Sequence, residues 1–370
     1  MSWFLAFAGF AALIILHEFG HFAAAKAVGM RVERFALFFP PLIAKVRRGE
    51  TEYGIGAIPL GGYVRITGMS PREELPPDVA HRAYYRQAVW KRIVVIAAGP
   101  AMNVLIAFLI AFGLLLSQGV VQPHSLRVNQ VASKAGATGK LQEGDRIVSI
   151  DGHRGYQPGL TDGQVDRRQA ELRRVVNSHT CAGKQTNRCK ATTPATVVVL
   201  RDGERVTLKI TPTYDAQLKR MLLGIGYGES QAVGPGRAAV LSGEAMWRVT
   251  RLTVTAIARV FYDEQARKQV SGVVGSYERT RQRFEFDTLS ALQLLAFISL
   301  SLAVVNLFPF LPLDGGHIFW ALAEKVRGGP IPFSIMERAS VVGFMLVAFL
   351  FVIGLTNDIG RLSGQGFGVR

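Results

Sequence analysis

The sequence predicts an α-helical membrane protein with about four transmembrane helices, a membrane-associated β-hairpin and an inserted α+β domain. Two observations predict this fold class. Several apolar runs are long enough to cross a bilayer, and a long polar stretch between them has the pattern of a water-soluble domain. The composition agrees, because 49% of the 370 residues are hydrophobic and only 19% are charged. Such a chain is too apolar for an ordinary soluble protein and too charged to lie wholly in a membrane.

The apolar spans define an expected topology. They cover residues 3–25, 93–117, 289–311 and 339–356. The loop 26–92 carries twelve Lys or Arg and six acidic residues, so the positive-inside rule places it in the cytoplasm. The N-terminus and residues 118–286 are then expected outside, between membrane cores at 1–117 and 289–370. A signal peptide's basic start and cleavage site are missing, so we expect the first helix to be retained.

The formal net charge of +16 raises the question of nucleic-acid binding. The basic residues are spread through loops without an RNA- or DNA-binding signature, and long apolar spans argue against that class. We therefore expect no nucleic-acid partner, and a lipid bilayer as the surroundings.

The first span contains an H-E-x-x-H motif, in which His17, Glu18 and His21 occupy the three defined positions. On a helix, positions i and i+4 share a face, so the two imidazoles can bind one zinc ion with Glu18 beside them as general base. Each ionisable side chain in mid-span costs about 2.5 to 3.5 kcal/mol, which a bound metal would offset. Catalytic zinc takes three protein ligands and a water, so a third ligand must come from elsewhere.

The segment after the third span offers that ligand. Pro309 and Pro312 forbid a regular helix there, and unwound backbone at membrane depth usually lines a cavity. Asp314 is expected on the same membrane face as the two histidines and could complete a His, His, Asp set. A turn or helix-capping role for Asp314 is the alternative, and His317 is a second candidate ligand.

Two further membrane-core motifs stand out. Residues 51–66 suggest two short strands around a Leu60-Gly61-Gly62 turn, either dipping into the membrane interface or forming an ordinary surface hairpin. In the second span, Pro100 and Asn103 suggest a kink and a buried interhelical hydrogen bond, which we interpret as architecture.

Residues 118–232 have the pattern of the soluble domain. A turn, strand and turn are expected over residues 139–152, a polar helix over 162–177, and a hairpin with an Asp-Gly turn over 196–208. This series resembles a PDZ domain, which binds extended peptides by adding a strand to its sheet edge. An insertion carries the chain's two cysteines, Cys181 and Cys189, expected as a small disulfide loop or as two free thiols.

Residues 233–288 are expected to lie on the membrane surface. Within 236–261, apolar residues alternate with five charged ones, which makes a spanning helix improbable. We expect an amphipathic helix on the outer membrane face, with a solvated helix packed on the soluble domain as the alternative.

Together these motifs resemble the bacterial site-2 proteases, which are intramembrane zinc metalloproteases. The matching features are His17-Glu18-x-x-His21, the glycine loop from 56 to 62, Gly99-Pro100-x-x-Asn103, one PDZ domain, and the stretch from Asn306 to Gly315 with its Leu-Asp-Gly end. They occur in the family's order over nearly the whole chain. The string Ser271-Gly272-Val273-Val274-Gly275 departs from the family, which often has Pro in the third position.

The resemblance implies a zinc-dependent endopeptidase of the bacterial inner membrane. It implies zinc ligation by His17, His21 and Asp314, general-base work by Glu18, and substrate contact or oxyanion support from Asn306. The family's substrates are transmembrane helices of proteins already trimmed by an upstream site-1 protease, often anti-sigma factors, and some members clear signal-peptide remnants. The alternative is a PDZ-containing membrane receptor or chaperone with a vestigial metal site.

A helical substrate must be extended before cleavage, because its peptide carbonyls are hydrogen-bonded within the helix. Extension frees backbone groups that cost several kcal/mol each when unsatisfied in lipid, so the enzyme must offer replacements. We expect the substrate to add as a strand to the edge of the segment 53–66. The glycines that would permit close approach there are Gly54, Gly56, Gly61 and Gly62.

Overall fold

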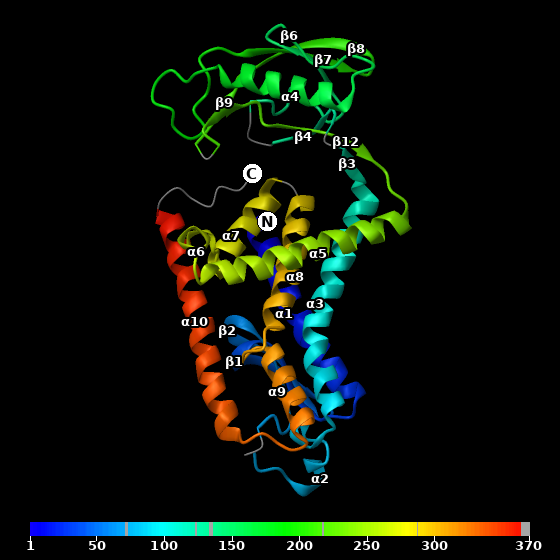
Figure 1. Ribbon diagram of the computed structural model, residues 1–370, viewed down its shortest axis with the longest axis vertical. Helices are drawn as coiled ribbons and strands as arrows, with labels where there is room; N and C mark the ends of the chain where they lie inside the picture. Colours follow the sequence, from blue (N-terminus) through cyan, green and yellow to red (C-terminus); the bar gives the residue numbers. More distant parts are fainter. Residues whose placement is uncertain (71–72, 123, 133–135, 217, 287, 364–370) are drawn as a thin grey trace. The chain divides into compact units, whose positions relative to one another are not determined.

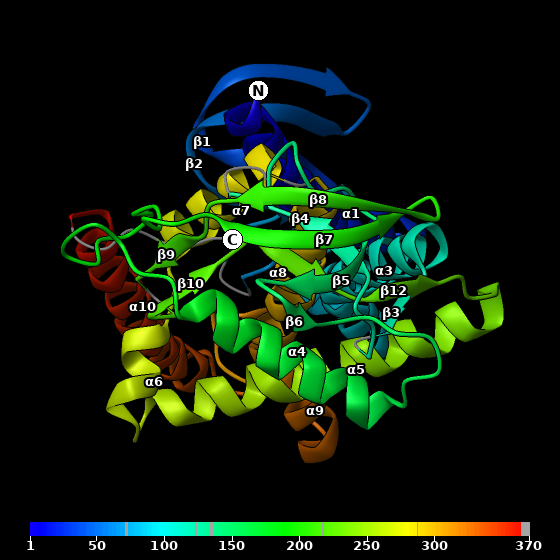
Figure 2. The same cartoon turned by 90° about the horizontal axis from the view of Figure 1, so that it is seen from above.

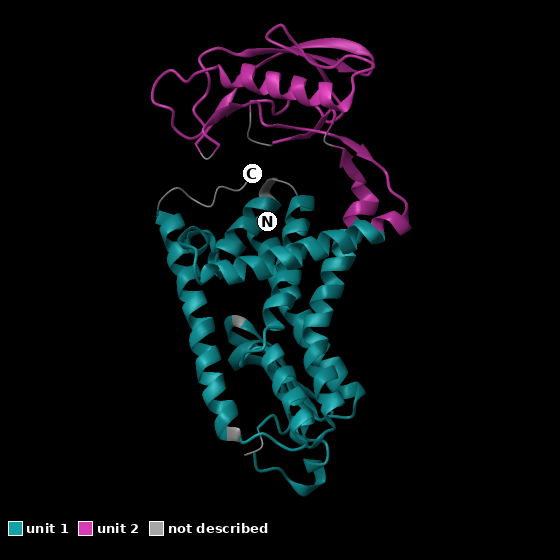
Figure 3. Cartoon of the chain, viewed as in Figure 1, with its two compact units in different colours: residues 1–113, 239–369 teal, residues 114–238, 370 magenta. Residues whose placement is uncertain are grey.

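The structure is a computed structural model that describes residues 1–70, 73–122, 124–132, 136–216, 218–286 and 288–363. The chain divides into two compact units (Figure 3). One unit joins Met1–Gly113 to the chain from Ala239 onward, and the other is Leu114–Ala238.

Four described helices are long and apolar enough to cross a membrane, as predicted, so the chain is a multi-pass membrane protein (Figure 1). They are α1 (Ser2–Ala27), α3 (Val89–Gln118), α8 (Thr288–Asn306) and α10 (Phe333–Ser363). α8 ends before the predicted residue 311, because Pro309 and Pro312 cannot continue a helix. α10 runs past the predicted residue 356, because its polar last turns find partners: Asn357 Nδ2 donates to the Val270 carbonyl at 3.0 Å.

The loop between α1 and α3 contains two long strands, β1 (Val32–Arg48) and β2 (Thr51–Ile66), followed by α2 (Pro77–Ala80) and the short 3₁₀ helix η1 (Tyr84–Arg86). The turn between the strands is tied down by Glu50, which pairs with Arg82 at 2.6 Å and with Lys26 at 2.5 Å. This network anchors the strands to the end of α1.

The predicted pairing within residues 51–66 is wrong. The two halves of β2 do not pair with each other around Leu60-Gly61-Gly62; both pair with β1, so that Phe35 lies opposite Tyr53 on one side and opposite Val64 on the other. The glycines gave a turn signal, but β1, which the sequence did not mark as a strand, supplies the partner. Residues 52–55 are therefore enclosed between two stretches of β1, and the described ladder leaves residues 62–66 as an edge.

The other compact unit contains a mixed set of short strands and one helix. Its main sheet has the strand order β6-β5-β7-β8, with α4 alongside (Figure 2). The main-sheet elements are β5 (Arg146–Ile150), β6 (His153–Arg154), β7 (Ala195–Arg201) and β8 (Glu204–Ile210), and the helix is α4 (Asp162–Asn177). Shorter pairs are formed by β3 (Val120–Gln122) with β12 (Glu229–Gln231), β4 (Val128–Val131) with β11 (Ile225–Tyr227), and β9 (Thr213–Asp215) with β10 (Arg220–Leu222).

The core of this unit forms between α4 and the sheet. Leu172 of α4 is fully buried in one cluster with Ile147 and Val199 of the strands. The predicted helix over 162–177 and the predicted hairpin over 196–208 are both present, and the hairpin turns at Asp202-Gly203, where both residues have positive φ.

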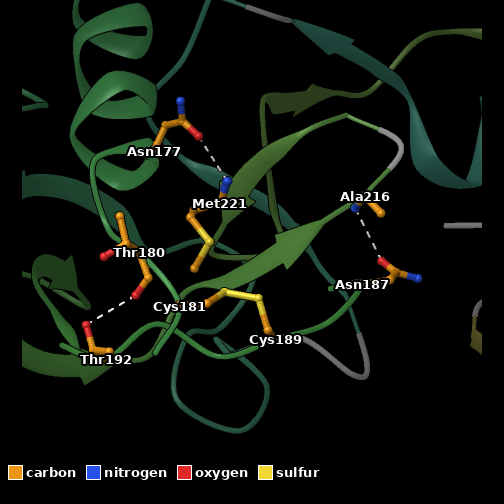
Figure 4. Close-up of a disulfide and its surroundings, with 8 residues drawn as sticks. All are labelled: Asn177, Thr180, Cys181, Asn187, Cys189, Thr192, Ala216 and Met221. Atoms are coloured by element: carbon orange, nitrogen blue, oxygen red, sulfur yellow. Dashed lines mark hydrogen bonds between the residues drawn. A yellow bond between two sulfur atoms is a disulfide. The ribbon is translucent and has the colours of Figure 1, made fainter. Parts of the chain in front are cut away.

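The two cysteines are joined in a disulfide, Cys181 to Cys189 (Figure 4). The eight-residue separation closes a small loop. Asn187 within the loop accepts a hydrogen bond from the Ala216 N–H at 3.4 Å, and Thr192 Oγ1 donates to the Thr180 carbonyl at 3.2 Å (Figure 4). The alternative of two free thiols is therefore wrong.

Three helices follow this unit: α5 (Pro235–Val260), α6 (Glu264–Gln269) and α7 (Val273–Phe286). α5 forms where an amphipathic helix is predicted, and it runs across the direction of α3 and α10 (Figure 1). α7 packs against both α1 and α8. Its Tyr277 hydroxyl donates to the Trp3 carbonyl of α1 at 3.0 Å.

Candidate metal centre

The centre begins with one face of α1. His17 and His21 are one helical turn apart, and each is buried, with 8% and 7% of its surface exposed. Their Nε2 atoms converge to 3.3 Å. The apolar helix α1 therefore carries two imidazoles whose Nε2 atoms lie close enough to bind a single ion.

The third group comes from the start of α9 (Asp314–Arg327). The unwound segment after α8 ends where α9 begins, and the α9 glycines let the chain fold back tightly: a Cβ at Gly315 would meet the Leu307 carbonyl oxygen at 2.2 Å. Asp314 Oδ2 lies 3.4 Å from Nε2 of His17 and 3.4 Å from Nε2 of His21. It is a buried oxygen without a hydrogen-bond partner in the described structure.

These three atoms have the spacing of a zinc ligand set. Ligands about 2.0 to 2.1 Å from a tetrahedral ion stand about 3.3 to 3.4 Å from one another. The three distances here are 3.3, 3.4 and 3.4 Å. Among described residues, His17, His21 and Asp314 form the group of at least three His, Cys, Asp or Glu able to hold a metal, and His317 is not in it.

α3 supports both histidines from behind. The Nδ1 atom of His21 lies 2.9 Å from the Val95 carbonyl oxygen, to which it can donate a hydrogen bond. The Nδ1 atom of His17 lies 3.1 Å from the side-chain amide of Asn103. The sequence suggested a buried interhelical hydrogen bond at Asn103, but it did not show that the partner is a metal-site histidine.

Two glycines permit this approach of α1 and α3. A Cβ at Gly99 would lie 2.2 Å from His21 Nε2, and one at Gly20 would lie 2.3 Å from the Ala98 carbonyl oxygen. Both distances are far inside ordinary contact. The Gly99-Pro100-x-x-Asn103 motif is therefore part of the metal centre as well as of the helix.

Glu18 faces β2. A Cβ on Gly62 would lie 2.7 Å from Glu18 Cγ. The strand edge that begins at Gly62 thus borders the candidate general base.

The other predicted substrate-binding residues lie in different surroundings. Gly54 and Gly56 pack against β1, where a Cβ would meet the Leu42 side chain at 2.9 Å and the Phe39 carbonyl oxygen at 2.1 Å. Gly61 faces the Phe39 ring, and Asn306 is the last residue of α8, at the start of the unwound segment.

Two histidines and a glutamate on one helix, completed by an aspartate that follows an unwound segment, form a candidate metal centre of the kind that membrane-embedded metallopeptidases use. Comparison with known proteins agrees: the chain belongs to peptidase family M50, whose model matches residues 5–350. This membership confirms the resemblance to site-2 proteases.

Curated relatives match over nearly their full length. The chain is 31% identical to zinc metalloprotease Rip1 of Mycobacterium tuberculosis, over 94% of each chain. It is 25% identical to zinc metalloprotease RasP of Bacillus licheniformis, over 95% of this chain and 97% of the relative.

Proposed function

We propose that the chain is a zinc-dependent intramembrane endopeptidase that hydrolyses peptide bonds within transmembrane segments of single-span membrane proteins. The observation that carries the proposal is the 3.3 to 3.4 Å triangle of ligand atoms formed by His17 and His21 of the apolar helix α1 and Asp314 at the start of α9. Zinc is the cofactor, in keeping with the family and with the relatives named zinc metalloproteases.

The residues divide the chemistry between them. His17, His21 and Asp314 would hold the zinc, which would lower the pKa of a bound water and polarise the scissile carbonyl. Glu18 would serve as general base and then as proton donor to the leaving amide nitrogen. Gly62 of β2 lies directly against the Glu18 side chain.

Asn306 has two candidate roles, one in catalysis and one in structure. As an oxyanion donor it would contribute roughly 3 to 4 kcal/mol to transition-state stabilisation. As a structural group it would hold the unwound segment that presents Asp314. The position of Asn306 at the end of α8 is compatible with both roles.

The substrate adds as a strand to β2. The pairing of β2 with β1 limits the part of β2 that is free to accept it. Gly54 and Ile55 pair with β1 on both sides, so this part of the expected segment 53–66 offers no free edge. Residues 62–66 are the edge that borders Glu18. We therefore centre the substrate-binding strand on Gly61 and Gly62, and assign Gly54 and Gly56 to the packing of β2 on β1.

The orientation follows from charge and chemistry. The basic loop 26–92 faces the cytoplasm, so the N-terminus and the unit with the disulfide lie outside, in the periplasm or its equivalent. The Cys181 to Cys189 bond supports this placement, because disulfides persist in oxidising compartments. That unit is a PDZ domain over 118–232 with a cysteine-bearing insertion, and α5 lies on the outer membrane face.

The partners are membrane proteins of one class. Substrates are single-span proteins trimmed by an upstream site-1 protease, such as anti-sigma factors, or signal-peptide remnants. The alternative is a PDZ-containing receptor or chaperone with a vestigial metal site. It is disfavoured because Glu18 and three well-spaced ligand atoms are all present.

The test is to co-express the full chain with tail-trimmed single-span candidates and to measure cleavage and zinc content together. Glu18→Gln should lower the cleavage rate by about 10²- to 10⁴-fold with zinc retained, because it removes a base and no ligand. Asp314→Ala should lose zinc, and His317→Ala, its matched control, should keep it. Normal turnover by Glu18→Gln, or zinc loss only in His317→Ala, would contradict the proposal.

A further inference from the structure

We infer that Asn103 is a positioning residue that orients His17 for zinc by accepting a hydrogen bond from its ring through the amide oxygen. The inference rests on the proposed zinc site. Asn103 lies fully buried on α3, and its side-chain amide is 3.1 Å from His17 Nδ1. The contact joins α3 to the metal face of α1.

The required direction of this hydrogen bond follows from the geometry of His17. Its Nε2 atom is the one that converges with Nε2 of His21 and with Asp314. An imidazole that gives one nitrogen to a metal carries its proton on the other and needs an acceptor there. For His17 that other nitrogen is Nδ1, and the group beside it is the Asn103 amide.

An asparagine amide can present either end. The oxygen and nitrogen of the amide have nearly the same shape, so their assignment follows from the hydrogen-bond network. In the present arrangement the nitrogen faces the ring, and Oδ1 is a buried atom without a partner. Turning the amide over places the oxygen, the acceptor that zinc-bound His17 needs, beside Nδ1.

α3 also provides a hydrogen-bond acceptor for the second histidine, His21. His21 Nδ1 faces the Val95 carbonyl oxygen at 2.9 Å, and a carbonyl can only accept. Both ligands thus have an outer partner on one helix, by main chain for His21 and by side chain for His17.

The backbone of Asn103 is held on its other side. Ser299 of α8, itself fully buried, donates from Oγ to the Asn103 carbonyl oxygen at 2.9 Å. Asn103 is therefore fixed between α8 and α1. A residue placed only for helix packing would not need its amide directed at the ring of a metal ligand.

The experiment measures zinc affinity of the purified full chain by competition with a chromogenic chelator, with no substrate present. Asn103→Leu keeps the volume and removes the acceptor, and it should weaken zinc binding by about 10- to 100-fold. Asn103→Asp keeps an oxygen beside the ring but has no N–H to donate, and it should bind zinc as tightly as wild type or tighter. Thr280→Val, which removes a fully buried hydroxyl from α7, is the matched control and should leave the affinity unchanged.

The outcomes separate this inference from the proposed function. A wild-type chain that binds no zinc contradicts the proposed function. A wild-type chain that binds zinc, with Asn103→Leu binding equally well, overturns the role of Asn103. If Asn103→Leu does not fold, as judged by circular dichroism, Asn103→Asp decides: a tenfold or greater loss of affinity shows that the amide acts as donor and refutes the inference.

Discussion

Replacing Gly99 with alanine should remove zinc while leaving the fold largely intact. The added methyl would lie 2.2 Å from His21 Nε2, the atom proposed to bind the metal, and 2.5 Å from Cε1 of the same ring. These atoms belong to one rigid ring, so a small change of rotamer cannot relieve both contacts.

The size of the disturbance can be taken from the distances. Going from 2.2 Å to the 3.4 Å of an ordinary contact requires the ring to retreat by about 1.2 Å. Separating α1 from α3 instead would break the 2.9 Å contact of His21 with the Val95 carbonyl. Misplacing a reacting group by about 1 Å costs on the order of 100-fold in rate, and we expect a similar or larger loss of zinc affinity.

The assay is zinc content of the purified protein by mass spectrometry, together with cleavage of a transmembrane substrate. Gly113→Ala is the matched control on the same helix, because no atom lies within 4 Å of its added methyl. Full zinc occupancy and wild-type cleavage by Gly99→Ala would show that this approach of α1 and α3 does not support the site.

Three more predictions follow from contacts beside Glu18, between α3 and α9, and at the C-terminal end of α1. Gly62→Ala places a methyl 2.7 Å from Glu18 Cγ and should lower kcat at least tenfold with zinc retained; an unchanged kcat, or zinc loss, would count against the Glu18 assignment. Arg92 pairs with Glu324 at 2.7 Å, and Glu324→Gln leaves the guanidinium without a charged partner. The free energy of unfolding in a denaturant titration should fall by about 1.5 to 3 kcal/mol, and no change would mean that the pair is dispensable. Hydrogen bonds from Arg82 and Lys26 lower the pKa of Glu50 from 4.5 to about 2, so the ionised carboxylate of Glu50 stabilises the folded protein. This contribution should be complete above pH 4.5 and be lost as the pH falls towards 2, and equal acid sensitivity of wild type and Glu50→Gln would contradict it.

The sequence alone predicted the features that depend on short periods and on composition. The four membrane helices follow from apolar length. The shared face of His17 and His21 follows from the helical repeat, which any α-helix obeys. The polar helix over 162–177 and the Asp-Gly hairpin are likewise local, because their signals lie within the elements themselves.

Features that join distant segments could not be predicted in this way. The two halves of β2 were expected to pair with each other, and the structure places residues of β1 between them instead. A turn signal depends on a few neighbouring residues, whereas strand pairing depends on which distant strand covers the apolar face. For that reason the proposed edge for the substrate narrowed from the whole segment 53–66 to residues 62–66.

The candidate metal centre also has features that the local sequence predicts and features that depend on the packing of distant segments. The sequence indicated the two candidate histidine ligands, because the motif states their spacing on the helix, but it left Asp314 and His317 both open as the third. The contacts that α3 makes with these ligands, Gly99 against His21 and Asn103 against His17, were decided only by the tertiary structure. The local sequence of α1 or of α3 does not require these contacts. They form only because the two helices pack closely enough for α3 to supply the hydrogen-bond partners of α1.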